Sequence, residues 1–155
     1  MSVAYLGLGS NLGRRKHYLE QALRALEQHA GRLLKSSSFI ETAPWGYDSP
    51  NPYLNAALAL ETTLTPHQLL SVTQQIERDL GRTRKSRGGQ YHDRVIDIDI
   101  LYYDDRVINE PGLTIPHPRL HRRRFVLEPL NEIAPQFIDP QRHLAVAQML
   151  ARLDD

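Results

Sequence analysis

The order of the apolar segments predicts an α+β fold, a ferredoxin-like sandwich with a mainly antiparallel sheet, packed helices and a C-terminal extension. Segments with strand and helix periodicity follow one another as strand, helix, strand, strand, helix, strand, and further elements come after them. No internal repeat or linker divides the 155 residues. We therefore expect a single domain over residues 1–155, long enough to bury a core.

The first predicted strand, residues 2–8, runs into a glycine-rich turn, and residues 15–29 carry the apolar stripe of a helix. The glycine spacing of the turn is one residue too long for a dinucleotide-binding fingerprint, and the turn lacks the lysine of a P-loop. A compact strand-to-helix turn is therefore favoured over a phosphate cradle.

Two more strands are predicted at residues 33–42 and 53–63, on either side of a loop with three prolines at residues 43–52. Trp45 and Tyr47 in this loop either close over a flat ligand or anchor the loop. The composition alone leaves both alternatives open.

A second helix begins at Thr65, which has the features of an N-cap. Pro66 suits the first helical position, Gln68 completes a capping box, and Gly81 is expected to end the helix. A basic loop at residues 82–91 follows. The remaining expected elements are a strand at 94–101, a turn at 104–105, a return strand at 106–109 that forms a hairpin with it, and helices at 126–133 and 143–153.

The strand at 94–101 has chemically different faces. One face carries isoleucines at 96, 98 and 100, and the other carries Asp97 and Asp99. Aspartate is disfavoured in strands, so the pair calls for an explanation. Carboxylates roughly 6.5 Å apart along a strand can converge on metal ions about 3.5–4 Å apart, the spacing used in phosphoryl chemistry. The alternative is a solvated polar stripe on an antiparallel sheet.

Composition narrows the classes of function. The net charge is only +1, with basic residues concentrated at 82–87 and 119–124, which favours a small anionic ligand over nucleic acid. The absence of cysteine excludes disulfides and thiol chemistry. No segment has the pattern of a signal peptide or of a membrane span. We expect a cytoplasmic monomer without a membrane partner.

His117 and His121 have the i, i+4 spacing of a zinc pair. Pro116 and Pro118 stiffen an extended backbone around His117, which makes a regular helix there doubtful. A zinc site is therefore the weaker reading.

Several short motifs follow one another along the chain. As an ordered set they identify a family more specifically than any single motif does. They are Gly9-Ser10-Asn11-Leu12, Ser38-Phe39-Ile40-Glu41-Thr42-Ala43-Pro44, Tyr53-Leu54-Asn55-Ala56-Ala57, Gln74-Gln75-Ile76-Glu77, Gly81-Arg82, the strand from Arg94 to Leu101, and Pro116-His117-Pro118-Arg119 with Arg123 and Phe125. In this order and spacing they resemble the 6-hydroxymethyl-7,8-dihydropterin pyrophosphokinase family of folate biosynthesis. The resemblance runs from the first turn to about Pro135.

The resemblance implies a ferredoxin-like fold and transfer of pyrophosphate from ATP to a pterin hydroxymethyl group, with release of AMP. It implies that Asp97 and Asp99 bind two Mg²⁺ ions, which suits a metal that prefers oxygen ligands. ATP and a reduced pterin are the expected partners, and the loops at 43–52 and 82–91 resemble mobile lids.

The resemblance also implies the residues of each subsite. The catalytic group comprises Arg82, Arg94, Asp97 and Asp99. The nucleotide group comprises Gln74, Glu77, Arg82, Arg84, Tyr91, Arg94, Ile100, Thr114, His117 and Arg123. The pterin group comprises Thr42, Ala43, Pro44, Trp45, Tyr53, Asn55, Asp97 and Phe125.

Two other functions remain as alternatives. A ferredoxin-like RNA-binding module stacks bases on sheet aromatics, but the corresponding aromatic motif is absent, and Asp97 and Asp99 would repel phosphate. A metal-dependent phosphohydrolase would use the same aspartates. The resemblance implies that Tyr53 and Phe125 form an aromatic pair around a flat ring, and this pair favours a pterin kinase.

Overall fold

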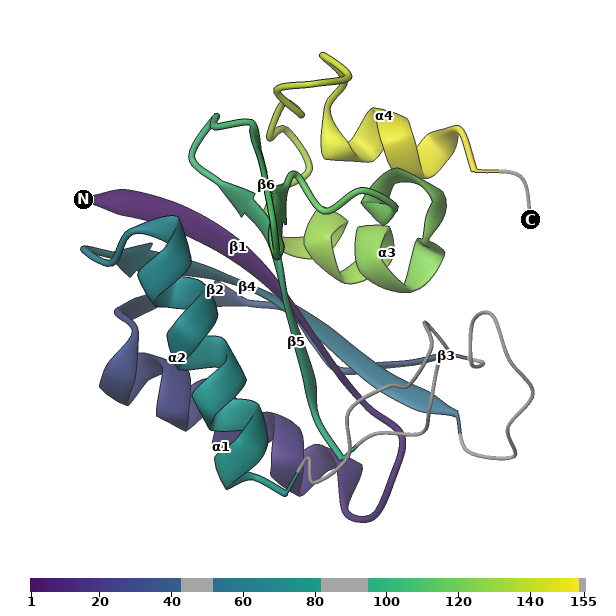
Figure 1. Ribbon diagram of the computed structural model, residues 1–155. Helices are drawn as coiled ribbons and strands as arrows, with labels where there is room; N and C mark the ends of the chain where they lie inside the picture. The colour runs from purple at the N-terminus through teal and green to yellow at the C-terminus, as the bar shows by residue number, and fades with distance from the viewer. Residues whose placement is uncertain (43–51, 82–94, 154–155) are drawn as a thin grey trace.

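The computed structural model describes residues 1–42, 52–81 and 95–153 and has a four-stranded antiparallel path at its centre (Figure 1). The order β2-β4-β1-β5 is that of a ferredoxin-like sheet, which confirms the predicted fold class. The first elements are β1 (Ser2–Ser10), α1 (Arg15–His29), β2 (Arg32–Ser36), β3 (Ile40–Thr42), β4 (Tyr53–Thr62), α2 (Pro66–Asp79) and β5 (Asp97–Tyr103). The later ones are β6 (Ile108–Glu110), β7 (Leu113–Ile115), the 3-10 helix η1 (Leu120–Arg122), α3 (Arg124–Ile133) and α4 (Val146–Ala151).

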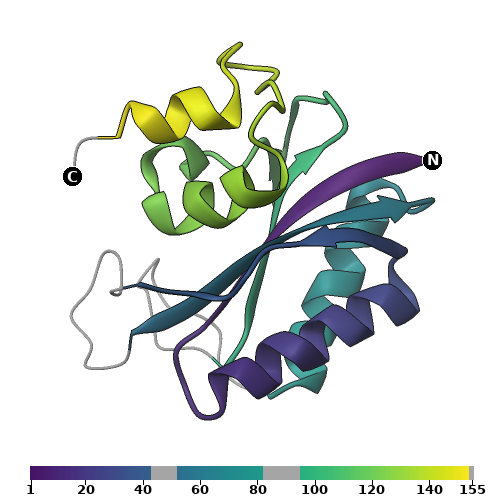
Figure 2. The ribbon, with the colours of Figure 1, turned by 180° about the vertical axis from the view of Figure 1, so that it is seen from behind.

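Helices cover both faces of the sheet (Figures 1 and 2). The first face packs against α1 and α2, and its core is almost wholly aliphatic. The C-terminal extension folds back as α3 and α4 over part of the second face, where a separate core forms around Tyr102, Leu127 and Leu130. Because α3 and α4 cover only part of the second face, one end of that face can form a site.

Strand alternation assigns each residue of β1 and β5 to one face. Leu6 and Leu8 of β1 pack under the helices with the isoleucines of β5, and all of them are buried. The pairing of β1 with β5 slips by one residue between Tyr5 and Leu6, so Leu101 has no residue opposite it. This bulge brings Leu101 and Tyr102 into the second core together.

The start of α2 forms as the sequence predicts. The Thr65 hydroxyl accepts from the Gln68 N–H at 3.2 Å, and the Gln68 side chain accepts from the Thr65 N–H at 2.9 Å. The reciprocal bonds satisfy two of the N–H groups that a helix start leaves without partners.

The predicted strand at 33–42 is wrong as a single element, because it divides into β2 and β3. Between them the Ser37 N–H donates to the Ala57 carbonyl at 2.8 Å, and the Ser37 hydroxyl accepts from the Ala57 N–H at 2.9 Å. One serine therefore bonds both backbone groups of one residue in β4, which interrupts the regular ladder.

The predicted hairpin between the strand at 94–101 and residues 106–109 is also wrong. Residues of β6 pair with β7 in a separate two-stranded sheet. The outer edge of β5 has other partners: Glu77 accepts from the Ile98 N–H, and the Leu101 carbonyl accepts from the His117 N–H.

The C-terminal extension is fastened to β5 by a buried carboxylate. The Tyr102 hydroxyl donates to Asp139 Oδ2 at 2.6 Å, and Asp139 Oδ1 accepts from the N–H groups of Gln141 and Arg142. Burial and this bond raise the pKa of Tyr102 well above its usual value. The last helix, α4, is shorter than the predicted 143–153. None of the described helices is long and apolar enough to cross a membrane.

Candidate active site

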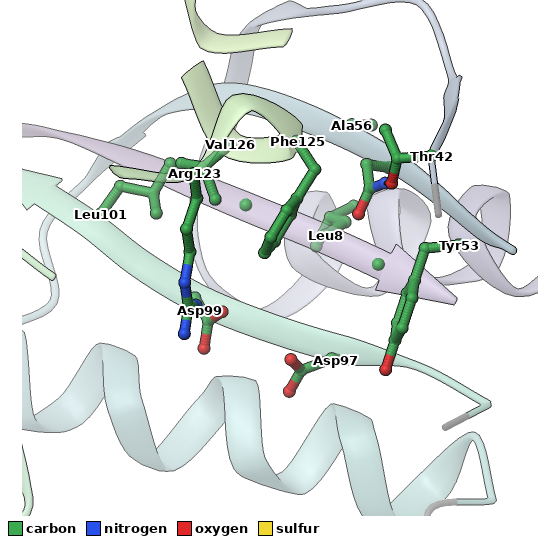
Figure 3. Close-up of a pocket in the computed structure, with 13 residues that line it drawn as sticks. Leu8, Thr42, Tyr53, Ala56, Asp97, Asp99, Leu101, Arg123, Phe125 and Val126 are labelled. Atoms are coloured by element: carbon green, nitrogen blue, oxygen red, sulfur yellow. The ribbon is translucent and has the colours of Figure 1, made fainter. Parts of the chain in front are cut away.

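A cavity opens on the second face of the sheet, where β1, β4 and β5 meet the start of α3 (Figure 3). Its volume is about 70 Å³, and it is partly open to solvent. The lining residues are Gly7, Leu8, Gly9, Thr42, Tyr53, Asn55, Ala56, Asp97, Asp99, Leu101, Arg123, Phe125 and Val126.

Asp97 and Asp99 project from β5 into this cavity, as the alternation of the strand predicts. Their partners across the sheet are Gly9 and Gly7 of β1, so both aspartates face glycines. Both are partly exposed, whereas Ile98 between them is buried on the opposite face. A rigid strand thus presents two carboxylates to one cavity.

The donor set at β5 fits Mg²⁺ better than a metal caged by protein alone. Carboxylate oxygens are hard ligands, and Mg²⁺ usually takes one or two of them together with water and substrate phosphates. Within residues 1–42, 52–81 and 95–153, no three His, Asp or Glu side chains gather closely enough to hold a metal ion. This part of the chain therefore supplies no third ligand for a zinc ion on His117 and His121.

Two aromatic rings stand over the aspartates. Tyr53 extends from the start of β4 and Phe125 from α3, and Figure 3 shows the rings side by side with open space between them. The Arg123 guanidinium lies 5.5 Å from the centre of the Phe125 ring. Such a slot suits a flat, polar ring that stacks on both faces.

A buried amide defines the inner end of the slot. Asn55 is 4% exposed, and its Nδ2 donates to Thr42 Oγ1 at 2.6 Å and to the Ile40 carbonyl at 3.5 Å. These bonds turn Oδ1 towards the floor of the cavity, where a Cβ added to Gly9 would lie 3.2 Å from it. Asn55 therefore presents a hydrogen-bond acceptor to a ligand in the slot.

Sequence reasoning missed the floor of the cavity. Gly7 and Gly9 occupy the positions of β1 that face Asp99 and Asp97, and neither has a side chain to fill the space. The signal was available, since two glycines at alternate positions of a strand mark a close approach. Leu8, Ala56, Leu101 and Val126 also line the cavity and were not predicted to do so.

A second, more open cavity adjoins the first. It is lined by Tyr53, Asp97, Asp99, His117, Pro118, Arg119 and Arg123, so the two cavities share both aspartates, Tyr53 and Arg123. Its arginines suit an anionic ligand, because a guanidinium donates several hydrogen bonds and stays charged.

His117 in the second cavity is electrically neutral near pH 7. Burial and then the charge of Arg123 lower the pKa of His117 to about 4. The ring Nδ1 accepts from the Arg119 N–H at 3.4 Å, which favours the tautomer with its proton on Nε2. His117 is thus a hydrogen-bond donor and not a cation.

Not every predicted site residue reaches the two cavities. Gln74 on α2 and Thr114 on β7 are exposed, and Ile100 packs its side chain in the helix-side core. Glu77 is buried against β5. The predicted residues Ala43, Pro44, Trp45, Arg82, Arg84, Tyr91 and Arg94 lie outside the described residues.

Comparison with known proteins identifies the family. The family model for 7,8-dihydro-6-hydroxymethylpterin-pyrophosphokinase matches residues 5–135. A 2-amino-4-hydroxy-6-hydroxymethyldihydropteridine pyrophosphokinase of Porphyromonas gingivalis is 52% identical over 87% of this chain and 92% of its own length. The Bacillus subtilis protein of that name is 47% identical over 87% of this chain and 80% of its own, and the Methylorubrum extorquens protein 43% identical over 99% and 95%.

Solved structures agree on the fold. A crystal structure described as HPPK-DHPS in complex with substrates aligns with a TM-score of 0.79 at 17% identity, over 97% of this chain. A wild-type Plasmodium falciparum HPPK-DHPS structure aligns with a TM-score of 0.80. This chain spans less than half of either solved chain, so it corresponds to one part of each.

The sheet order and the cavity with two carboxylates define a ferredoxin-like protein with a ligand site, and its relatives are named as pyrophosphokinases. The chain belongs to the 7,8-dihydro-6-hydroxymethylpterin-pyrophosphokinase family. The resemblance seen in the sequence motifs and the expectation of an ATP-dependent pterin pyrophosphokinase are confirmed.

Proposed function

We propose that this chain transfers a pyrophosphoryl group from ATP to the hydroxymethyl oxygen of 6-hydroxymethyl-7,8-dihydropterin and releases AMP. The observation that carries the proposal is that two adjoining cavities share Asp97, Asp99, Tyr53 and Arg123. A flat acceptor in the first and a nucleotide in the second meet at the two carboxylates. The names of the relatives supply the substrate class.

The pterin lies between Tyr53 and Phe125, and stacking on them contributes about 0.5–1.5 kcal/mol beyond the buried area. Asn55 Oδ1 accepts a hydrogen bond from a ring N–H, since its Nδ2 is engaged by Thr42 and Ile40. Ala43, Pro44 and Trp45 complete this subsite in the proposal.

The triphosphate lies in the second cavity, where Arg123 supplies fixed positive charge and His117 Nε2–H donates to an anionic oxygen. Arg82, Arg84, Tyr91 and Arg94 extend this subsite in the proposal. Gln74, Thr114 and the backbone of Ile100 have roles nearer the nucleoside.

Asp97 and Asp99 are the proposed ligands of two Mg²⁺ ions, which when bound neutralise the phosphates and polarise them for attack. In the reaction, the hydroxymethyl oxygen bonds to the β-phosphorus and loses its proton. The bond from that phosphorus to the oxygen shared with the α-phosphorus breaks, and AMP leaves. The stacked rings orient the acceptor, and the strand holds the carboxylates still.

The proposal is tested by incubating the protein with ATP, Mg²⁺ and 6-hydroxymethyl-7,8-dihydropterin and following nucleotides by chromatography. AMP should form in proportion to the pterin diphosphate and only when the pterin is present. Formation of ADP and phosphate without any pterin dependence would instead establish the phosphohydrolase alternative.

The enzyme acts as a monomer in this proposal, because residues of one chain line both cavities. We also propose that the reaction takes place in the cytoplasm, where ATP is available. Light scattering during size-exclusion chromatography tests the first statement, and a dimer mass at assay concentration contradicts it.

A further inference from the structure

Helix α2 places a buried carboxylate against the strand that carries the aspartates. Glu77 is 5% exposed, and its Oε2 accepts from the Ile98 N–H at 2.9 Å in a buried hydrogen bond. Ile98 stands between Asp97 and Asp99, so the bond holds the backbone at the midpoint of the pair.

The position of β5 in the sheet explains why the Ile98 N–H needs an acceptor from a side chain. Among the described residues, strand β5 is at the edge of the sheet and has β1 as its one neighbouring strand there. Ile98 is opposite Leu8 of β1, but its N–H bonds Glu77 on the other side. A buried backbone N–H without an acceptor is strongly unfavourable, and the Glu77 carboxylate supplies an acceptor for this one.

The choice of glutamate is unusual for a buried helix position. Its neighbours on this face of α2 are Leu69, Thr73 and Ile76, which pack under the sheet. Glutamate is seldom buried unless its charge has partners. A carboxylate accepts a stronger hydrogen bond than a neutral amide oxygen does, so Glu77 fixes the peptide more firmly than glutamine would.

We propose that Glu77 is a positioning residue for Asp97 and Asp99. By fixing the peptide at Ile98, it sets the tilt of the two adjacent side chains, which leave the strand on the same face. Small displacements matter in such a site, because ligands must be held within about 0.5 Å of the productive geometry. The inference rests on the proposed metal role of the two aspartates.

This role is separate from the nucleotide contact expected from the sequence, which stays a prediction. The Glu77 side chain is absent from the lining of both cavities and lies against backbone. The bond to the Ile98 peptide gives Glu77 a route to the site through the strand.

The test compares Glu77→Leu, which removes the acceptor, with Glu77→Gln, which keeps a neutral one. The matched control is Thr73→Val on the same buried face, where the hydroxyl bonds only the Leu70 carbonyl within the helix. Two quantities are measured: amide hydrogen exchange at Ile98 in protein without metal or nucleotide, and Mn²⁺ affinity by electron paramagnetic resonance with a non-hydrolysable ATP analogue.

We expect Glu77→Leu to speed exchange at Ile98 by about tenfold or more and to weaken Mn²⁺ binding by about 10–100-fold. Glu77→Gln should retain slow exchange and weaken Mn²⁺ binding by about threefold at most. Thr73→Val should change neither quantity, although it changes the same helix.

Several outcomes overturn the inference. Unchanged exchange at Ile98 in Glu77→Leu contradicts the bond, and lost protection with normal Mn²⁺ affinity reduces Glu77 to a structural residue. If Glu77→Leu does not fold, Glu77→Gln decides: a tenfold loss of Mn²⁺ affinity with intact exchange protection assigns the effect to charge and not to positioning.

Asp97→Asn and Asp99→Asn separate this inference from the proposed function. If they weaken Mn²⁺ binding and the Glu77 variants do not, only the positioning role fails. If the aspartate variants also bind Mn²⁺ normally, the metal pair itself is wrong.

Discussion

The two faces of the sheet are built from the same strands but have different tasks. On the helix side, β1 contributes Leu6 and Leu8 and β5 contributes Ile98 and Ile100, all buried in one core. On the other side, one residue along, the same strands contribute Gly7, Gly9, Asp97 and Asp99 to the cavity.

The difference shows how one strand can contribute to the stability of the fold with one face and to the cavity with the other. Side chains alternate across a strand, so apolar burial on one face fixes the backbone while the other face is left to polar groups. The carboxylates can remain partly exposed because the isoleucines anchor the strand. Substitutions on the two faces should therefore separate stability from activity.

The largest expected effect is on the cavity face. Asp97→Ala should lower kcat by about 10³-fold or more, because removal of a proposed metal ligand withdraws charge stabilisation from the transferred phosphates. The unfolding temperature should change little. Steady-state assays at saturating ATP and pterin measure this, with circular dichroism as the check on folding. A variant with near-normal kcat would remove Asp97 from the catalytic group.

The complementary experiment is on the face of the sheet that packs against α1 and α2. Leu6→Ala deletes a fully buried side chain and should lower the free energy of unfolding by about 2–5 kcal/mol. At a temperature where the variant is folded, kcat should stay within about twofold of the original value. Urea denaturation and assays on the same sample test the pair of expectations. A large loss of kcat in folded protein would show that the faces are not separable.

A smaller effect is expected at the wall of the cavity. Tyr53→Ala removes one ring of the slot and should weaken pterin binding by about tenfold, from lost stacking and lost apolar contact. ATP affinity should be nearly unchanged, and isothermal titration calorimetry can compare the two ligands. The control Tyr5→Phe alters an aromatic residue of the second core, beside Phe137 and away from the cavity lining. Equal losses for pterin and ATP in Tyr53→Ala would contradict a pterin-specific role.

Local pattern was sufficient to predict much of this architecture. The alternation at 94–101 predicted which side chains of β5 share a face, and the capping residues predicted the start of α2. The division at Ser37 and the pairing of β6 with β7 were not predictable, because both depend on partners elsewhere in the fold. Tyr53 and Phe125 are far apart in the sequence, so periodicity alone could not bring them to one slot; the family resemblance did.

The role of Glu77 likewise depends on a partner that local sequence pattern does not predict. Its position in the motif Gln74-Gln75-Ile76-Glu77 suggested a nucleotide contact, but the bond to Ile98 depends on how α2 packs on β5. Sequence can identify a chemically unusual residue, whereas its partner is decided by the packing.

The smallest expected effect concerns the floor of the cavity, where two glycines differ in their surroundings. A Cβ on Gly9 would lie 3.2 Å from Asn55 Oδ1 and 3.3 Å from Tyr53 Cδ1, whereas a Cβ on Gly7 would meet Leu101 at an ordinary 3.5 Å. Gly9→Ala must therefore displace a group of the proposed pterin subsite by a few tenths of an ångström. It should weaken pterin binding by about 3–10-fold, against about twofold for Gly7→Ala. Calorimetry on both variants tests the ranking, and equal losses would mean that lost volume matters more than displacement of Asn55 and Tyr53.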